Sequence, residues 1–260
     1  MAFRLVKKPK RIVCLTEEPT EILYLLGEEK RIVGISAYTC RPKQAKEDKP
    51  VVSAFISGSV KKIIDLEPDL IIGFSDIQGQ LAKDLIEANQ QVIIFNQRTV
   101  QEILEVIYMI GAIVGVPNRA SDLIKTYIQR LNKLQNKSRL KRPKVYFEEW
   151  DDPMISGIRW VSELIELAGG HDIFLEKSKG KLAKERFVQN EDVIGKNPDI
   201  YIASWCGKKF NKPSVLNRPG WTDINAIKRD HIYELDPSII LQPGPACLSD
   251  GLDELEKIIK

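Results

Sequence analysis

The clearest indication of the fold is the stretch Lys62-Ile-Ile-Asp-Leu-Glu-Pro-Asp-Leu-Ile-Ile-Gly-Phe74. Its apolar residues first follow the spacing of a short helix, and Pro68-Asp69 then introduces a continuous apolar run that is typical of a buried strand. The same layout returns at Glu191-Asp-Val-Ile-Gly-Lys-Asn-Pro-Asp-Ile-Tyr-Ile-Ala203. This internal repeat predicts two similar α/β lobes, although Pro-Asp before a strand also occurs in α/β proteins with a single lobe.

Strands and helices alternate on both sides of these two stretches. In the first half, the patterns predict strands at 11–15, 31–35, 68–74 and 91–95, and helices at 21–26, 60–66 and 77–88. In the second half, they predict strands at 143–147, 198–205 and 231–235, and helices at 161–168, 191–195 and 251–259. Such alternation predicts a mostly parallel sheet with helices on both faces in each lobe.

The segment between the two halves is helical throughout. Apolar residues recur at helical spacing from Ile103 to Leu134, and Gly115 and Pro117 interrupt the pattern once. We therefore expect one helix to about Val114 and a long second helix that follows it. The predicted fold is α/β, with two Rossmann-like lobes of mostly parallel sheet joined by one long helix. Its parts are an N-terminal lobe at 1–116, a connecting helix at 117–141 and a C-terminal lobe at 142–260.

The composition excludes several classes of protein. Hydrophobic residues make up 43% and charged residues 29%, which is a globular balance. The chain has 39 Lys and Arg against 36 Asp and Glu, so it lacks the basic excess of a nucleic-acid binder. No apolar run approaches the roughly 20 residues that span a bilayer. The first ten residues lack the apolar core of a secretion signal. We expect a cytoplasmic protein, or an extracytoplasmic one whose leader was removed.

Common enzyme motifs are missing from the sequence. There is no G-x-S-x-G elbow, no Walker A loop, no H-E-x-x-H, and no G-x-G-x-x-G after the first strand. The chain has two histidines and four widely spaced cysteines, so we expect free thiols, no metal site and no cofactor. We predict a protein that is not an enzyme. The enzymatic alternative would use Glu148, Glu149 or Cys206.

Candidate ligand-binding residues follow the predicted strands, because open parallel sheets bind ligands at the carboxyl ends of their strands. These segments are rich in aromatic, carboxylate and amide side chains, which suits a bulky organic ligand. The candidates in the first lobe are Glu17, Glu18, Tyr38, Phe55, Phe74, Asp76 and Arg98. Those in the second lobe are Glu148, Glu149, Trp150, Arg159, Trp160, Trp205 and Gln242.

The tryptophans and arginines among these candidates have alternative roles. Trp150, Trp160 and Trp205 fall in predicted loops at strand ends, where they can contact a ligand or pack the lobe. Trp221 lies in a turn, and we expect it to be structural. Arg98 and Arg159 can pair with a carboxylate or phosphate of the ligand, or with Glu148 or Glu149.

The segment from Pro9 to Gly27, followed by Arg31-Ile-Val-Gly-Ile-Ser-Ala-Tyr38, resembles the opening of the vitamin B12- and iron-siderophore-binding proteins of ABC importers. Similar stretches lie at 64–72, 160–170 and 191–199, so the resemblance covers nearly the whole chain. It implies two lobes joined by one rigid helix, with a corrinoid or ferric siderophore bound between them. It also implies an ABC importer permease as a possible partner, and we expect a monomer.

The resemblance further implies docking on the importer through one acidic residue on each lobe, in the short helix before the Pro-Asp strand. Glu191 matches that position in the second lobe, whereas the first-lobe position falls at about Lys61. Asp65 or Glu67 supplies the acid instead if the alignment is shifted by a few residues. Besides the enzyme, there is a second alternative to a transport component: a cytoplasmic metabolite-binding or sensor protein that has no transporter.

Overall fold

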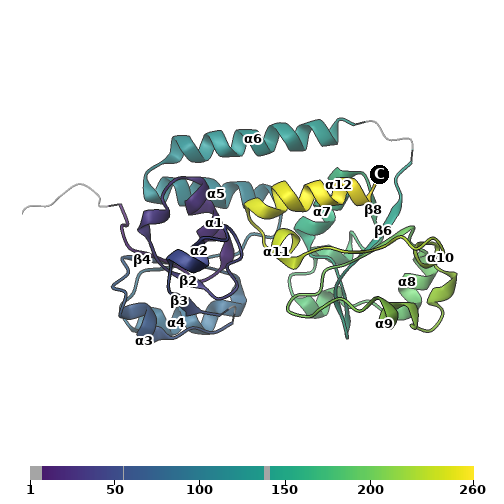
Figure 1. Cartoon of the computed structure of the whole chain (residues 1–260), viewed down its shortest axis with the longest axis horizontal. Coiled ribbons are helices and arrows are strands. Elements are labelled where there is room, and N and C mark those ends of the chain that lie inside the picture. Colours follow the sequence, from purple (N-terminus) through teal and green to yellow (C-terminus); the bar gives the residue numbers. More distant parts are fainter. Residues whose placement is uncertain (1–7, 55, 138–140) are drawn as a thin grey trace, which may run out of the picture. The chain divides into compact units, whose positions relative to one another are not determined.

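The computed structural model describes residues 8–54, 56–137 and 141–260 (Figure 1). They form two compact units. Unit 1 holds the chain up to Gln97 and Gln101–Thr126, and unit 2 holds Arg98–Val100 and Tyr127–Lys260. The candidate residue Phe55 lies outside the described residues. Each unit contains a β-sheet, and the α/β class predicted from the sequence is confirmed.

Unit 1 contains a five-stranded sheet in which every neighbouring pair is parallel. Its strands are β1 (Ile12–Cys14), β2 (Ile32–Ser36), β3 (Val51–Ser53), β4 (Leu70–Phe74) and β5 (Val92–Phe95), in the order β3-β2-β1-β4-β5. Its helices are α1 (Glu17–Leu25), α2 (Ala45–Asp48), α3 (Val60–Ile64), α4 (Gly79–Glu87) and α5 (Val100–Val114). The strand order reverses between β1 and β4, which is where doubly wound sheets bind ligands.

Alternating residues of β1 explain how the unit 1 sheet is covered. Val13 and Leu15 point to the same face and pack with Ile63 of α3 and with Leu81 and Leu85 of α4. All five side chains are at most 5% exposed. Helices α3 and α4 therefore cover one face of the sheet, and they lie side by side in Figure 1.

Unit 2 contains a mixed sheet. Its strands are β6 (Lys144–Asp151), β7 (Met154–Ser156), β8 (His171–Asp172), β9 (Ile200–Ala203) and β10 (Ile232–Glu234). The order is β10-β9-β6-β7, with β8 also on β6, and only the β6–β7 pair is antiparallel. The helices are α7 (Arg159–Ala168), α8 (Asn190–Lys196), α9 (Lys212–Leu216), α10 (Asn225–Lys228), α11 (Pro237–Ile240) and α12 (Leu252–Ile258).

Two predictions about the second half are wrong. Strand β6 runs on to Asp151, so Glu148, Glu149 and Trp150 lie within the strand and not in a loop after it. The polar run gives no strand signal, yet it forms an antiparallel hairpin with β7. Arg159 and Trp160 were also expected in a loop, but they begin α7.

The segment between the two sheets contains the two expected helices. Helix α5 ends at Val114, Gly115 has φ +81°, and α6 (Pro117–Gln135) follows. Proline fits the first helical position because it lacks the amide hydrogen that would have no partner there. Residues of α6 up to Thr126 belong to unit 1, and those from Tyr127 onward belong to unit 2.

The Pro-Asp repeat makes the same contacts in both units. The Asp69 carboxylate accepts a hydrogen bond from the Arg11 backbone nitrogen at 2.9 Å, and the Asp69 backbone nitrogen donates to the Arg11 carbonyl at 2.9 Å. In unit 2, Asp199 bonds to Lys144 in the same two ways, at 3.1 and 2.8 Å. Each aspartate thus joins the start of its strand to the start of the central strand beside it.

Candidate ligand-binding site

The carboxyl ends of the unit 1 strands gather several of the predicted residues at one edge of the sheet. Because the sheet is parallel, the segments after β2, β1 and β4 follow one another along this edge. They carry Tyr38, Glu17 with Glu18, and Asp76, respectively. Phe74 is the last residue of β4 and is buried, whereas Arg98 belongs to unit 2.

Exposed apolar side chains occupy the same edge. Tyr38 after β2, Ile56 after β3 and Ile77 after β4 are 50%, 68% and 46% exposed, respectively. Large apolar side chains that gather on a surface commonly mark a binding site. The sequence analysis missed Ile56 and Ile77, although the rule that identified Asp76 applies equally to the residue after it. We call Tyr38, Ile56 and Ile77 the apolar rim.

A group of buried polar side chains lies at the same end of β1. Glu17 and Glu18 form the first turn of α1 and are 2% and 1% exposed. One Glu17 oxygen accepts a hydrogen bond from the Cys40 backbone nitrogen at 3.2 Å. Neither Glu18 oxygen, nor the hydroxyl of Thr16 or Thr39, forms a hydrogen bond with the part of the chain that the structure describes. The Thr16 hydroxyl is near enough to lower the pKa of Glu18, but it does not reach hydrogen-bond geometry.

Burial changes the ionisation of this carboxyl pair. Loss of solvation, followed by the neighbouring Glu18 charge, raises the pKa of Glu17 from 4.5 to about 8. Loss of solvation also raises the pKa of Glu18, to about 7. Glu17 is therefore mostly protonated at neutral pH, and Glu18 is divided between its two forms.

In unit 2 the predicted residue Glu148 is fully buried, and both oxygens of its carboxylate accept hydrogen bonds. Its carboxylate accepts hydrogen bonds from the hydroxyls of Tyr146 at 2.9 Å and Tyr201 at 2.7 Å, and from Trp205 Nε1 at 3.1 Å. Both terminal nitrogens of Arg218 donate to it, at 2.6 and 2.9 Å. A carboxylate has about four lone-pair sites, so this one is saturated by the protein. The geometry favours a structural role over ligand contact.

The neighbouring Glu149 is also in an ion pair. The buried Arg186 donates to its two oxygens at 2.5 and 3.1 Å, and to the Ser156 carbonyl at 2.6 Å. Arg159 pairs with Glu163 of the same helix at 3.1 Å, so it does not bridge to Glu148 or Glu149. For Arg159, that alternative from the sequence analysis is wrong.

Two of the three candidate tryptophans lie together. Lys208 Nζ lies 5.5 Å from the ring centre of Trp150 and 5.2 Å from that of Trp205. The same ammonium pairs with Asp151 at 2.6 Å. Trp150 is half-buried, whereas Trp205 is only 3% exposed. Of this pair, Trp150 presents the larger surface to a ligand.

The remaining predicted residues of unit 2 lie apart from that pair. Trp160 is 3% exposed, and its Nε1 donates to the Ile240 carbonyl at 3.0 Å. Gln242 follows α11 and is half-buried. Trp221 is buried and donates to Asn190 at 2.5 Å, in agreement with the structural role expected for it.

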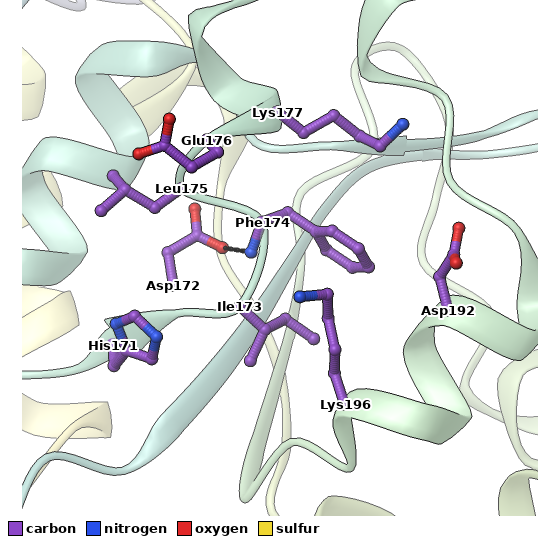
Figure 2. A pocket seen from close by; sticks show the side chains of 9 residues that line it. All are labelled: His171, Asp172, Ile173, Phe174, Leu175, Glu176, Lys177, Asp192 and Lys196. Carbon is purple, nitrogen blue, oxygen red and sulfur yellow. Dashed lines mark hydrogen bonds between the residues drawn. The ribbon is translucent and has the colours of Figure 1, made fainter.

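A pocket of about 520 Å³ lies elsewhere in unit 2, between the segment after β8 and helix α8 (Figure 2). In Figure 2 the Asp172 carboxylate points toward the Phe174 backbone nitrogen, which donates to it at 2.9 Å. Lys196 Nζ lies 5.4 Å from the Phe174 ring centre. The lining residues are His171, Asp172, Ile173, Phe174, Leu175, Glu176, Lys177, Asp192 and Lys196, and none of them is a predicted ligand-binding residue.

All four cysteines are free thiols, and Cys40 and Cys206 are the exposed ones. Over the described ranges, no three His, Cys, Asp or Glu side chains are grouped so that they could hold a metal ion. No helix within those same ranges combines the length and the apolar character that a membrane crossing requires.

A family comparison identifies the class of protein to which this α/β fold belongs. The family model described as periplasmic binding protein matches residues 12–239, so the chain belongs to that family. The uncharacterized ABC transporter substrate-binding lipoprotein YvrC of Bacillus subtilis is 29% identical, over 97% of this chain and 81% of the relative. The vitamin B12-binding protein of Vibrio vulnificus is 26% identical, over 92% of this chain and 86% of the relative.

Solved structures agree with this assignment. A possible iron-binding, periplasmic solute-binding protein from Staphylococcus epidermidis superposes with a TM-score of 0.82 at 26% identity, covering 97% of this chain and 99% of that one. The haem-binding protein RhuT from Roseiflexus has a TM-score of 0.80 at 22% identity, covering 96% and 99% of the two chains. The latter shows only a shared fold. The family resemblance seen in the sequence is confirmed.

Proposed function

We propose that this protein reversibly binds a bulky small molecule, a corrinoid or a ferric siderophore, as the substrate-binding component of an ABC-type import system. The observation that carries the proposal is the edge of the unit 1 sheet, where the exposed residues of the apolar rim and the buried Glu17 and Glu18 all follow the carboxyl ends of neighbouring strands. Ligand sites in proteins are mostly apolar and hold a few polar groups that fix orientation. Relatives named for substrate binding and for vitamin B12 binding support the same class of ligand.

The proposed role is binding without turnover. Glu148 and Glu149, two of the three residues that the enzymatic alternative names, are held by Arg218 and Arg186. A carboxylate that already accepts a bidentate arginine is a poor general base, because taking up a proton would leave the arginine charge unpaired. The sensor alternative needs the same binding site and differs only in lacking a transporter.

A thermal-shift screen with cobalamin, cobinamide, haem and ferric siderophores tests the proposal. A ligand at about 100 times its Kd adds roughly 2.7 kcal/mol to the free energy of unfolding. Tyr38→Ala should weaken binding of the ligand found, because this ring contributes much of the apolar rim. Tyr108→Ala is the matched control, since Tyr108 lies on α5 and is 47% exposed, against 50% for Tyr38. Equal losses for both variants would contradict this placement of the site.

A further inference from the structure

Four buried oxygen atoms beside the carboxyl ends of β1 and β2 have no hydrogen-bond partner among the described residues, although burial normally demands one. They are Thr16 Oγ1, Glu18 Oε1, Glu18 Oε2 and Thr39 Oγ1. Their residues are 2%, 1% and 0% exposed, respectively. Buried polar side chains nearly always have a partner, so a group of four such atoms requires an explanation.

The three residues come from adjacent segments of unit 1. Thr16 and Glu18 follow β1, Thr39 follows β2, and β1 and β2 are paired in the sheet. The bond from the Cys40 nitrogen to Glu17 ties the second segment to the first turn of α1. Thr16 occupies the N-cap position of α1, where its hydroxyl would ordinarily accept a backbone hydrogen bond, but it makes no such cap. Its oxygen is therefore available to another donor.

The two threonine hydroxyls can accept or donate, whereas the two oxygens of ionised Glu18 only accept, so Glu18 determines the chemistry of a matching partner. We propose that Thr16, Glu18 and Thr39 form a subsite for a nitrogen donor of the ligand, an amide or ammonium group, and that this subsite disfavours anionic ligands. The inference rests on the proposed function, since it concerns the same edge of the sheet. The nearby charged side chains agree with it, because the Glu21 carboxylate acts on Glu18 and Arg41 already pairs with Glu21 at 2.9 Å.

Three probe ligands separate the possibilities. Cyanocobalamin carries amide side chains, ferrioxamine B carries an ammonium group, and haemin carries two carboxylates. Isothermal titration of the full chain should give affinity for cyanocobalamin or ferrioxamine B at least tenfold above that for haemin. Glu18→Met keeps the length of the side chain and removes both acceptors, and Thr39→Val keeps the shape and removes the hydroxyl. Each should weaken binding of the preferred probe about tenfold.

Matched controls are Glu87→Met, on the exposed side of α4, and Thr126→Val, on the exposed side of α6. Both should change the affinity less than twofold. Valine has nearly the same shape as threonine, so we expect Thr39→Val to fold. This variant therefore still tests the inference if Glu18→Met does not fold.

Each other outcome overturns the inference in a distinct way. If cyanocobalamin or ferrioxamine B binds but Glu18→Met and Thr39→Val match the controls, buried water and not the ligand satisfies these oxygens, and the proposed function stands. If haemin binds as tightly as the other two probes, the inference is likewise overturned and the proposed function stands. Binding of none of the three probes overturns the proposed function together with the inference.

Discussion

Two buried glutamates show how the surroundings of one residue type set its role. Glu148 is paired with Arg218 and two tyrosine hydroxyls, so its charge is fully compensated in unit 2. Glu18 lies in unit 1 without such partners, and burial raises its pKa to about 7. The first arrangement stabilises the fold, whereas the second is the one that we propose to serve ligand binding.

The raised pKa values predict that the protein becomes less stable from pH 5 to pH 8. Burial raises the pKa of Glu17 to about 8, of Glu18 to about 7 and of Asp172 to about 6. In this range the unfolded chain has released these protons while the folded chain still holds them, so the free energy of unfolding falls as pH rises. We expect a decrease of roughly 2 to 5 kcal/mol, measured by urea unfolding at several pH values.

Glu17→Gln should flatten this pH dependence, because the amide has no proton to lose. Glu87→Gln is the control, since Glu87 is 66% exposed and should leave the slope unchanged. A stability that is constant or rises from pH 5 to pH 8 would show that Glu17 and Glu18 are solvated or paired in the folded protein.

The Glu148–Arg218 pair predicts a large loss of stability when the arginine is removed. Arg218→Met keeps much of the apolar stem, but it removes the guanidinium, whose Cζ lies 4.4 Å from the Trp221 ring centre, and it leaves Glu148 as a buried charge without compensation. Breaking a buried ion pair in this way costs about 3 to 5 kcal/mol in the free energy of unfolding. Urea unfolding at pH 7 measures it.

Arg229→Met serves as the comparison for Arg218→Met. Arg229 is 60% exposed and lies 3.9 Å from Asp199, so its loss should cost less than about 1 kcal/mol. Similar losses for the two variants would mean that the Glu148 charge is not isolated from water. No local sequence pattern indicates this pair, because the two residues are 70 positions apart and only the fold brings them together.

At the scale of elements, the two Pro-Asp repeats were predictable, and the β6–β7 hairpin was not. Each repeat shows a helical spacing followed by an apolar strand, which is a strong local signal. The end of β6 reads Glu-Glu-Trp-Asp, without the alternation that identifies a strand. Its acids lie in a strand because Arg218, Arg186 and Lys208 pair with them from distant segments. Local patterns therefore could not predict either the hairpin or the orientation of the candidate carboxylates.

The repeats also share a left-handed residue directly before the proline, and this predicts a stabilising substitution. Glu67 has φ 47° and Asn197 has φ 48°. Asparagine tolerates this region better than glutamate does, whereas a glycine adopts it without strain. Glu67→Gly should therefore raise the free energy of unfolding by about 1 kcal/mol. Asn197→Gly should change the free energy of unfolding by only a few tenths of a kcal/mol, and urea unfolding distinguishes the two variants. A destabilised Glu67→Gly variant would contradict the argument.

At the scale of the whole molecule, the two lobes present different charges at the positions that the family resemblance assigns to importer docking. Glu191 lies exposed in the first turn of α8, next to Asp192. Lys61 in α3 is 84% exposed and pairs with Asp65 at 2.6 Å, and Lys62 follows it. Unit 2 therefore offers acidic side chains at this position, whereas unit 1 offers lysines and a partly neutralised aspartate.

This charge pattern predicts that the protein does not form a tight complex with a B12-type importer. The resemblance implies that docking joins acidic residues of the binding protein to arginines of the membrane partner. Like charges placed opposite each other cost several kcal/mol and slow association. Lys61 and Lys62 of unit 1 would face these arginines of the membrane partner. Lys61→Glu should therefore strengthen binding to the importer by tenfold or more, measured by pull-down or in reconstituted transport with the organism's own importer.

Lys83→Glu is the matched control for this prediction, because Lys83 is 65% exposed in α4 of the same unit and changes the net charge equally. A specific docking contact predicts a gain for Lys61→Glu alone, whereas a general effect of charge predicts the same gain for both variants. Tight, saturable docking of the unaltered protein that Glu191→Ala abolishes would contradict the prediction. In that case Asp65 or Glu67 supplies the unit 1 acid. If it is Asp65, its pair with Lys61 must open when the importer binds.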